Sequence, residues 1–404
     1  MGASRPCPTE LDRSRSPPAV TPPRAYLAAR PLDMPHHLAQ SEGVAWMKAA
    51  LQRAAGAPGG PGADDVARAV RLYDVVARQS RIDARATALA DYTHADWDAM
   101  RVHAPSDGAG GAQPWHRAPL EARTAVFAET ALAAARQAFA DDAEPPHALA
   151  QVSCTGYDSP TAVQRVLVEK GWQGAGTRVL HVGHMGCYAA VPTAATLADL
   201  VSAEAGRTGA AVHGAAVLVE LCTLHHDPAT TDVERIVQQC LFADGAARMD
   251  VSSEPIGGGF ALLDHAEVVI PGTLDEMTWR AVGPAFRMTL SREVPQHIRE
   301  HIAPAMRRFL ESNGLAVGDV DVFAVHPGGP RVIESTADAL DLPDGAVRHS
   351  QEVLRTRGNM SSTTLPHIWA AIAADAAVPE GALVASVAFG PGLTVAMNLL
   401  RKGA

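Results

Sequence analysis

Gln151-Val-Ser-Cys-Thr-Gly156 is an apolar run that ends in a polar residue and a glycine, and the chain repeats this pattern 172 residues later (151 to 323) as Phe323-Ala-Val-His-Pro-Gly328. The same offset (186 to 358) aligns Gly186-Cys187 with Gly358-Asn359. In both copies small residues follow the second site, which suits the first turn of a closely packed helix. The repeat indicates that one α/β unit is duplicated in this chain.

Three residue types with useful chemistry fall on the repeated positions. Cys154 and Cys187 are 33 residues apart (154 to 187), and His326 and Asn359 are also 33 residues apart (326 to 359). The duplication is expected to bring a cysteine, a histidine and an asparagine to one place. Such a set is typical of an enzyme that forms carbon–carbon bonds by condensation.

The composition is that of an ordinary globular chain of 404 residues, with 47% hydrophobic and 19% charged residues. A formal net charge of −10 argues against a general nucleic-acid-binding protein, which needs a basic face. No apolar run reaches the roughly 18 residues of a membrane span, and the N-terminus lacks a signal sequence. The five cysteines are an odd number and widely spread, so we expect reduced thiols and a cytoplasmic protein.

The composition along the chain predicts three segments. Residues 1–23 are rich in Pro, Ser and Arg and should form a disordered leader. Residues 24–257 should form a half that contains the cysteine, and residues 258–404 a half that contains the histidine and the asparagine. Strands and helices alternate in the same order in both halves, which predicts an α/β protein, a five-layer α/β/α/β/α sandwich of two duplicated lobes.

Apolar periodicity predicts the individual elements. Helices are expected over residues 43–54, 64–79, 120–140, 160–170, 189–204, 232–239, 295–313, 332–340 and 361–374. Strands are expected over residues 148–153, 178–182, 215–221, 246–252, 259–269, 320–325, 382–389 and 393–400. An extended segment should run from 25 to 39, and loops are expected over residues 104–111 and between 340 and 361.

Each of the three candidate residues also has a plain structural interpretation. Cys187 precedes an apolar helix, whose positive end would favour a thiolate, as would a nearby imidazole, but a buried cysteine can also be inert. His326 ends a predicted strand, where open α/β sheets hold their sites, although its ring could simply cap the turn that follows. Asn359 could donate a hydrogen bond to an oxyanion or cap a helix. Only the equal spacing links the three residues.

Five ordered motifs resemble the signatures of the type III polyketide synthases, the chalcone synthase family of the thiolase fold. They are Gly186-Cys187, Leu241-Phe-Ala-Asp-Gly-Ala246, His326-Pro-Gly-Gly-Pro330, Gly358-Asn-Met-Ser-Ser362 and Phe389-Gly-Pro-Gly-Leu-Thr394. The resemblance implies a homodimeric acyltransferase that loads an acyl starter from an acyl-CoA, decarboxylates malonyl-CoA and condenses iteratively to a pyrone or phenolic polyketide. It implies coenzyme A thioesters as substrates and no metal or redox cofactor.

The resemblance also assigns roles to residues. By match to the motifs, Cys187 is the nucleophile, and His326 and Asn359 hold the oxyanion. Phe242 occupies the family's gate between tunnel and cavity, where Met288 replaces a second aromatic residue. Judged without the resemblance, Phe242 could equally be a core aromatic residue.

Further positions are expected to shape the cavity. Trp279 aligns with a glycine on the cavity floor of the plant enzymes and would shrink the cavity. The segment Cys154–Pro160 is shorter than in plants and resembles the bacterial branch. Glu220 and Ser361 are candidates for a water-activating network. The remaining candidate cavity residues are His225, Cys222 and Tyr157.

Several alternatives stay open. Arg78, Arg81 and Arg85 fall where the family's cluster for coenzyme A phosphates begins, although solvated helix arginines have the same pattern. An acyl carrier protein could replace coenzyme A as donor. The segment Cys222–Asp227 could supply metal ligands, but no second ligand pair matches it, so we expect no metal site. The other functions considered are a ketoacyl-carrier-protein synthase III-like enzyme that condenses once, and an inactive structural partner of another synthase.

Overall fold

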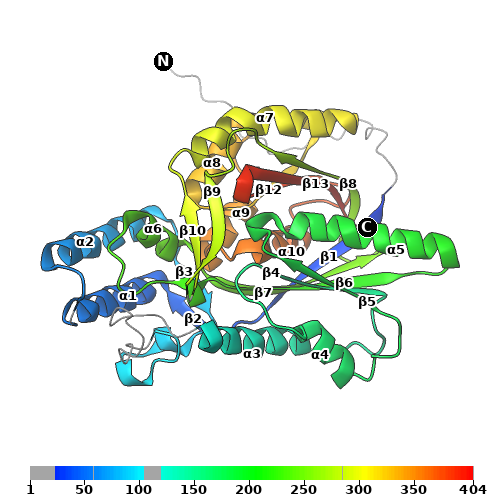
Figure 1. The fold of residues 1–404 in the computed structure, drawn as a ribbon. Coiled ribbons are helices and arrows are strands. Elements are labelled where there is room, and N and C mark those ends of the chain that lie inside the picture. The colour runs from blue at the N-terminus through cyan, green and yellow to red at the C-terminus, as the bar shows by residue number, and fades with distance from the viewer. Residues whose placement is uncertain (1–22, 58, 104–119, 284, 404) are drawn as a thin grey trace, which may run out of the picture.

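Two β-sheets lie one above the other in the computed structural model, with helices below, between and above them (Figure 1). The structure describes residues 23–57, 59–103, 120–283 and 285–403. The expected leader up to residue 22 and the expected loop at 104–111 therefore lie outside the described residues. The arrangement confirms the predicted five-layer α/β/α/β/α sandwich.

The lower sheet belongs to the first half of the chain. Its order is β1-β7-β6-β4-β5, in which β4 runs parallel to β5 and β6, and β7 is antiparallel to β6 and β1. The strands are β1 (Ala25–Leu32), β4 (Ala148–Ser153), β5 (Arg178–Gly183), β6 (His213–Leu221) and β7 (Asp244–Ser252). Helices α3 (Leu120–Ala138) and α4 (Ala162–Glu169) cover its lower face (Figure 1).

The upper sheet belongs to the second half. Its order is β11-β12-β13-β8, with β11 parallel to β12 and the other pairs antiparallel. The strands are β8 (Phe260–Val269), β11 (Val322–Val325), β12 (Leu383–Gly390) and β13 (Thr394–Lys402). Helices α7 (Val294–Ser312) and α8 (Pro330–Leu340) cover it from above (Figure 1). Three residue pairs between β1 and β8 join the two sheets at one edge.

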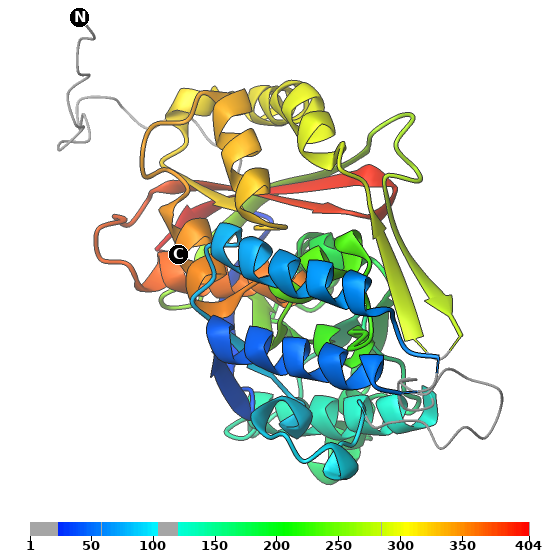
Figure 2. The same cartoon turned by 90° about the vertical axis from the view of Figure 1, so that its left-hand side faces the viewer.

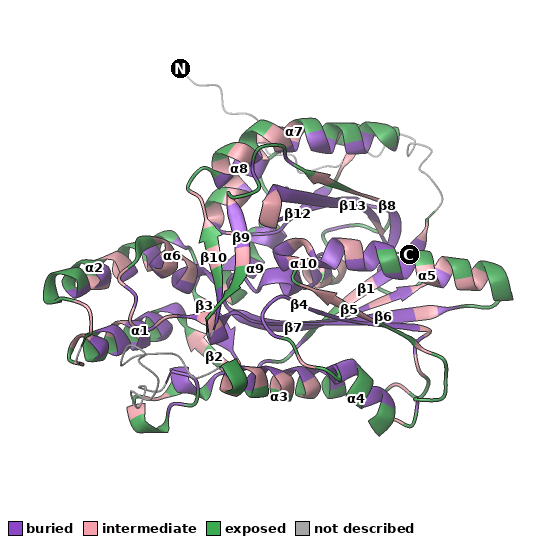
Figure 3. Ribbon diagram, in the orientation of Figure 1, coloured by how far each residue is buried: buried purple, intermediate pink, exposed green. Residues whose placement is uncertain are grey.

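The middle layer consists of α5 (Ala190–Thr208) and α10 (Thr364–Ala374). Both helices contribute to one buried apolar cluster because each has a sheet on two sides. Alanine and other small residues let α5 approach the sheets closely, while Trp369 of α10 is fully buried and its indole N–H donates to Ser386 Oγ at 2.8 Å. Figure 3 shows most of the two sheets and the inner faces of the helices as buried, whereas the edge strand β5 is intermediate or exposed.

A second group of elements packs beside this sandwich. It comprises α1 (Gln40–Ala55), α2 (Ala63–Gln79), β2 (His36–Ala39), β3 (Ala84–Thr87), α6 (Val233–Leu241), α9 (Arg348–Arg357) and a hairpin of β9 (Met277–Val282) and β10 (Ala285–Leu290). Figure 2 shows α1 and α2 side by side and the hairpin reaching from the upper half down beside the lower half. The short 3-10 helices are η1 (Ala90–Thr93), η2 (Trp97–Ala99), η3 (Gly186–Tyr188), η4 (Cys222–His225), η5 (Val317–Asp319), η6 (Ser361–Thr363) and η7 (Pro391–Leu393).

The repeated positions occupy equivalent places in the two halves. Cys154 directly follows β4 and His326 directly follows β11, while η3 and η6 lie just before the two middle helices. The expected division at residue 257 lies in the turn between β7 and β8, and we keep it as our division of the chain. None of the helices in the described ranges is long and apolar enough to cross a bilayer.

Candidate active site

Cys187 lies in η3, between β5 and α5, and only 7% of its surface is exposed. Gly186 before it has a φ of 78°, and a Cβ at this position would lie 2.9 Å from the Pro391 side chain. A residue other than glycine would be strained in conformation and would also collide with Pro391. The glycine therefore lets the loop after β12 close over the cysteine.

The backbone of Asn359 hydrogen-bonds to the residues on either side of the gate residue Phe242. Its backbone N–H donates to Leu241 O at 2.9 Å, and its carbonyl accepts from Ala243 N–H at 2.8 Å. Its side-chain Oδ1 accepts the N–H of Ser361 at 2.9 Å, so the amide orientation is fixed and the Nδ2 donor is left for other partners. The Oδ1 thus caps the start of η6, and the Nδ2 group remains suited to donate to an oxyanion.

The side chains of Ser361 and Asn359 both hydrogen-bond the Cys187 thiol and favour its thiolate. Burial outweighs them and raises the pKa of Cys187 to about 12, and the nearby Glu220 carboxyl acts in the same direction. Burial thus favours the thiol in the protein alone, while stabilisation of a thiolate by the helix end and by an imidazole stays a prediction. Cys187 lies three residues before α5 begins, and desolvation dominates.

His326 follows β11, and its backbone N–H donates to Val387 O at 2.8 Å. Only 1% of its surface is exposed, and neither ring nitrogen has a hydrogen-bond partner among the described residues. The alternative that its ring caps the following turn is therefore wrong. Burial lowers the pKa of His326 to about 3, so the imidazole is neutral at physiological pH, with one donor and one acceptor unused.

Two cavities meet at Cys187. An outer cavity of ≈ 760 Å³ is lined by Cys187, His326 and Asn359, and it opens between α2, α6 and the start of α7 and α8. An inner cavity of ≈ 60 Å³ lies beyond Cys187. The residues that line both cavities are Cys187, Phe242, Met277 and Met288. The two predicted gate positions thus lie at the junction of the cavities.

An aromatic cluster fills much of the inner cavity. The Trp279 indole N–H donates to Cys154 O at 2.6 Å, and its ring meets His225 and Phe286 edge-on at 5.4 and 5.8 Å between centroids. His225 stacks on Phe286 at 4.8 Å. Phe286 belongs to the unpredicted hairpin and was missed by the sequence analysis. The expected shrinkage of the cavity by Trp279 fits this packing.

Tyr157 does not line either cavity, which corrects our expectation. Its hydroxyl shares a hydrogen bond with His184 Nδ1 at 2.7 Å, and 37% of its surface is exposed. The cause is the preceding residue, Gly156, at which a Cβ would lie only 2.1 Å from the Phe127 ring. The chain passes close over Phe127 there, and Tyr157 lies nearer the surface.

Glu220 is fully buried beneath the cysteines. Its carboxylate accepts from Thr155 Oγ1 at 2.8 Å and from Ser362 Oγ at 2.5 Å. Burial raises the pKa of Glu220, and these hydrogen bonds oppose the shift. Cys154 connects it to the site, since its Sγ lies 3.4 Å from Glu220 Oε2 and 3.4 Å from Ser361 Oγ. A polar chain therefore runs from Glu220 through Cys154 and Ser361 to Cys187.

The candidate ligands Cys222, His225 and His226 do not converge on one point. His225 Nε2 bonds to Thr155 O at 2.7 Å, while its Nδ1 accepts the N–H of Phe286 at 3.2 Å, so both ring nitrogens are used. His226 Nδ1 bonds to the Tyr92 hydroxyl. Cys222 and both histidines line the inner cavity, as expected for Cys222 and His225.

The three candidate arginines have different surroundings. Arg85 is buried, and its Nη1 donates to the carbonyls of Gln239 and Phe242, both at 2.6 Å. It supports the gate segment, so its expected contact with coenzyme A is wrong. Arg78 and Arg81 are exposed, and the two residues between them in the sequence line the outer cavity. Arg81 forms an ion pair with Glu334.

Two other arginines line the outer cavity, Arg292 two residues before α7 and Arg331 in the first turn of α8. Neither arginine was predicted from the sequence. Arg331 directly follows the motif His326–Pro330, a signal that could have revealed it.

Comparison with known proteins agrees with this geometry. The family described as chalcone and stilbene synthases, C-terminal domain, matches residues 261–403. The 1,3,6,8-tetrahydroxynaphthalene synthase of Streptomyces peucetius subsp. caesius is 30% identical over 282 residues, which cover 68% of this chain and 72% of that protein. The chain belongs to the type III polyketide synthase family.

Other relatives agree with this assignment. The α-pyrone synthesis polyketide synthase-like Pks18 of Mycobacterium tuberculosis is 28% identical, over 61% of this chain and 63% of its own length. The structure of PKS-I from the brown alga Ectocarpus siliculosus has a TM-score of 0.78 and 25% identity, covering 94% of this chain and 98% of that one. The tetrahydroxynaphthalene synthase structure from Streptomyces coelicolor has a TM-score of 0.72 at 22% identity, covering 95% and 99%, and supports the fold.

Membership of the type III polyketide synthase family confirms the expected fold and enzyme class. The chain is an acyltransferase of the decarboxylative condensing type that builds polyketides iteratively from malonyl-CoA. Enzymes of this family use coenzyme A thioesters as substrates. The two alternatives, a single-condensation ketosynthase and an inactive partner, are not favoured.

Proposed function

We propose that this type III polyketide synthase loads a short acyl starter on Cys187, extends it with malonyl units and releases a small pyrone or phenolic product. Two of the relatives described above are named for a tetrahydroxynaphthalene and for an α-pyrone, and both products belong to this class. The observation that carries the proposal is the His326 imidazole, which is neutral and has no hydrogen-bond partner among the described residues, in the cavity that Cys187 and Asn359 also line.

The opposite pKa shifts suggest how loading begins. Because the pKa of Cys187 is raised to about 12 and that of His326 is lowered to about 3, both groups are neutral before substrate binds. As sulfur attacks the thioester carbonyl, the thiol proton passes to the imidazole, and the imidazolium returns this proton to the departing coenzyme A thiolate and becomes neutral again. The new bond is the acyl–sulfur bond, and the bond to the coenzyme A sulfur breaks.

The extension step uses two hydrogen-bond donors, the side chains of His326 and Asn359. Loss of carbon dioxide from the malonyl thioester leaves an enolate whose oxygen carries negative charge. Hydrogen bonds from His326 and from Asn359 Nδ2 to this oxygen lower the barrier. The enolate carbon then attacks the acyl group on Cys187 and frees its sulfur. This step needs only hydrogen-bond donors, so we propose that no cofactor takes part.

Arg292 and Arg331 are proposed to hold the phosphates of coenzyme A, because both line the outer cavity and are cationic. Arg78 and Arg81 would assist from the rim. The small inner cavity favours a short starter and few extensions. A homodimer, an acyl carrier protein as a possible alternative donor and a cytoplasmic location remain predictions.

The test is incubation of the full chain with malonyl-CoA and acyl-CoA starters of graded length, with mass spectrometry of products and protein. We expect an acyl adduct on Cys187 and products that contain two or more malonyl-derived units. Products of one condensation only would instead indicate a ketosynthase, and failure to release carbon dioxide from malonyl-CoA would indicate an inactive partner. Carrier-bound malonate, tested in parallel, identifies the donor.

A further inference from the structure

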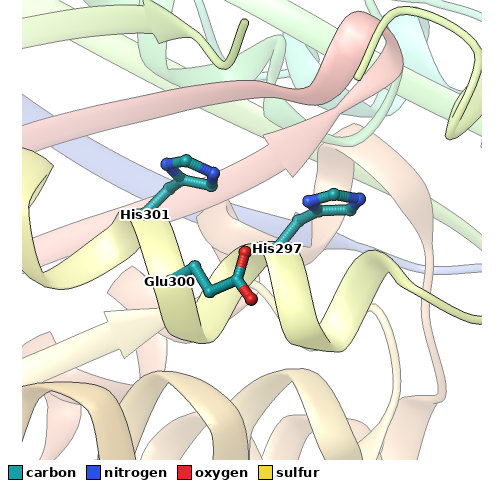
Figure 4. A group of neighbouring side chains, drawn as sticks. All are labelled: His297, Glu300 and His301. Carbon is teal, nitrogen blue, oxygen red and sulfur yellow. The ribbon is translucent and has the colours of Figure 1, made fainter. Parts of the chain in front are cut away.

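A cluster of metal-ligating side chains lies on α7, outside the active site. His297, Glu300 and His301 each offer a ligand atom, and these atoms all lie within 4.8 Å of one another. Figure 4 shows the two imidazole rings one turn apart on the same side of the helix, with the Glu300 carboxylate between them. Residues at i, i+3 and i+4 of a helix share a face, so the spacing holds the three groups together without any long-range contact.

A fourth group, from another element, lies near one member of the cluster, His297. Glu276, in the segment between β8 and β9, has its Oε1 3.9 Å from His297 Nε2. That distance is too long for a hydrogen bond. Two ligands of a tetrahedral zinc ion, each about 2.0–2.1 Å from the metal, lie about 3.4 Å apart, so small side-chain adjustments would bring both groups onto one ion.

The polar atoms of this cluster are incompletely satisfied. Glu276 Oε2 and His297 Nδ1 are buried and have no hydrogen-bond partner among the described residues. Buried polar atoms without partners are unfavourable, and an ion bound by the Glu276 carboxylate and one His297 nitrogen would partly relieve this cost. Glu300 Oε1 accepts from Gln296 Nε2 at 2.9 Å, which helps to keep its carboxylate beside the helix.

We propose that His297, His301, Glu300 and Glu276 form a binding site for a divalent transition-metal ion, with zinc as the preferred occupant. Two imidazoles and two carboxylates are the nitrogen and oxygen donors that zinc binds tetrahedrally, and the harder magnesium or calcium ions would accept imidazole poorly. The site departs from our expectation that the chain binds no metal. The sequence His297-Ile-Arg-Glu-His301 carried the signal.

The bound ion would act on the wall of the polyketide cavities. Glu276 directly precedes Met277, which lines both cavities, and α7 contributes Val294 and Ile298 to the outer one. The ion therefore cross-links α7 to the base of the hairpin that carries Trp279 and Met288. Its role is structural, since the cluster contains none of the residues proposed to touch substrate.

The experiment measures zinc binding to the chelator-treated full chain by calorimetry, and zinc content by elemental analysis after gel filtration. We expect one equivalent of zinc that is lost in the H297A/H301A double variant, and affinity about 10-fold or more lower in H301A or E276Q. Zinc should raise the melting temperature of the wild type by about 1–3 °C and leave that of the double variant unchanged.

The matched control is the H36A/H37A double variant, which also removes two histidines. These two residues are consecutive on strand β2 and point to opposite faces, so they cannot bind one ion together. The control should retain the wild-type stoichiometry and affinity. Equal zinc binding by the wild type and by a folded H297A/H301A protein would overturn the proposal, as would absence of binding to the wild type. Circular dichroism establishes that each variant is folded.

Discussion

At the scale of single residues, the site joins two groups whose burial shifts their pKa values in opposite directions. Burial keeps the proton on the Cys187 thiol and prevents the neutral His326 imidazole from taking up a second proton. A thiolate–imidazolium pair would place two charges in a region with little solvent, which is costly unless substrate compensates. The protein alone therefore holds a neutral pair, and the thioester carbonyl provides the site where the negative charge develops.

Replacing Cys187 with alanine removes the proposed nucleophile. We expect product formation to fall on the order of 1,000-fold or more and the acyl adduct to disappear from the intact mass, while the melting temperature changes little. The control is C240A, which alters another buried cysteine that lines neither described cavity. An adduct of unchanged mass and yield in the Cys187 variant would show that another residue carries the acyl group.

Replacing Trp279 with glycine enlarges the inner cavity. The change removes the ring packed against His225 and Phe286 and the hydrogen bond to Cys154 O. We expect products longer by at least one malonyl-derived unit, or acceptance of longer starters, in mass-spectrometric product analysis. R280A, which alters the exposed neighbour on β9, should keep the wild-type profile. An identical profile in both variants would mean that Trp279 does not limit the cavity.

At the scale of elements, the repeated strand–turn–helix units were predictable and the elements around the cavity were not. The strand at 148–153 was predicted with the observed bounds because it is an uninterrupted buried run. The expected loop between 340 and 361 contains helix α9, Arg348–Arg357, whose mostly polar sequence buries few apolar side chains and gives a weak periodic signal. The hairpin β9–β10 was missed as well, since it packs through a few aromatic contacts rather than through alternating apolar residues.

The turn after β4 provides a test of local packing. Alanine at Gly156 would place its Cβ 2.1 Å from the Phe127 ring, whereas Gly174 has no atom within 4 Å of the equivalent position. We expect G156A to lower the free energy of unfolding by about 1–3 kcal/mol and G174A to leave it nearly unchanged, measured by urea denaturation. Equal stability of the two variants would show that the chain after β4 can move away from Phe127.

At the scale of the whole molecule, neither half contains the complete site. The first half supplies Cys187 and Glu220 and the second supplies His326, Asn359 and Ser361, and the middle layer of α5 and α10 fixes the two sets relative to each other. The repeat in the sequence predicted that the residues of the two halves would come together in one site. The volume of the cavities was not predictable, because it depends on rotamers of Trp279 and its neighbours, which no spacing determines.

The neutral histidines between the layers predict how stability depends on pH. Burial lowers the pKa of His326 to about 3 and that of His367 to about 4, both below the value of 6.5 for an unperturbed imidazole. Above pH 6.5 both imidazoles are neutral in the folded and in the unfolded protein. As the pH falls from 6.5 toward these folded-state values, only the unfolded chain takes up the protons, so stability decreases.

Each of the two histidines should therefore lower the free energy of unfolding by about 2 kcal/mol between pH 7 and pH 5. Urea denaturation of the wild type and of H326Q at both values measures this loss, and the variant should show a loss smaller by about 2 kcal/mol because glutamine does not titrate. H37A, which changes an exposed histidine, should behave as the wild type. The same pH dependence in H326Q and the wild type would mean that the His326 imidazole accepts a proton in the folded protein, and the neutral pair proposed to start the reaction would not exist.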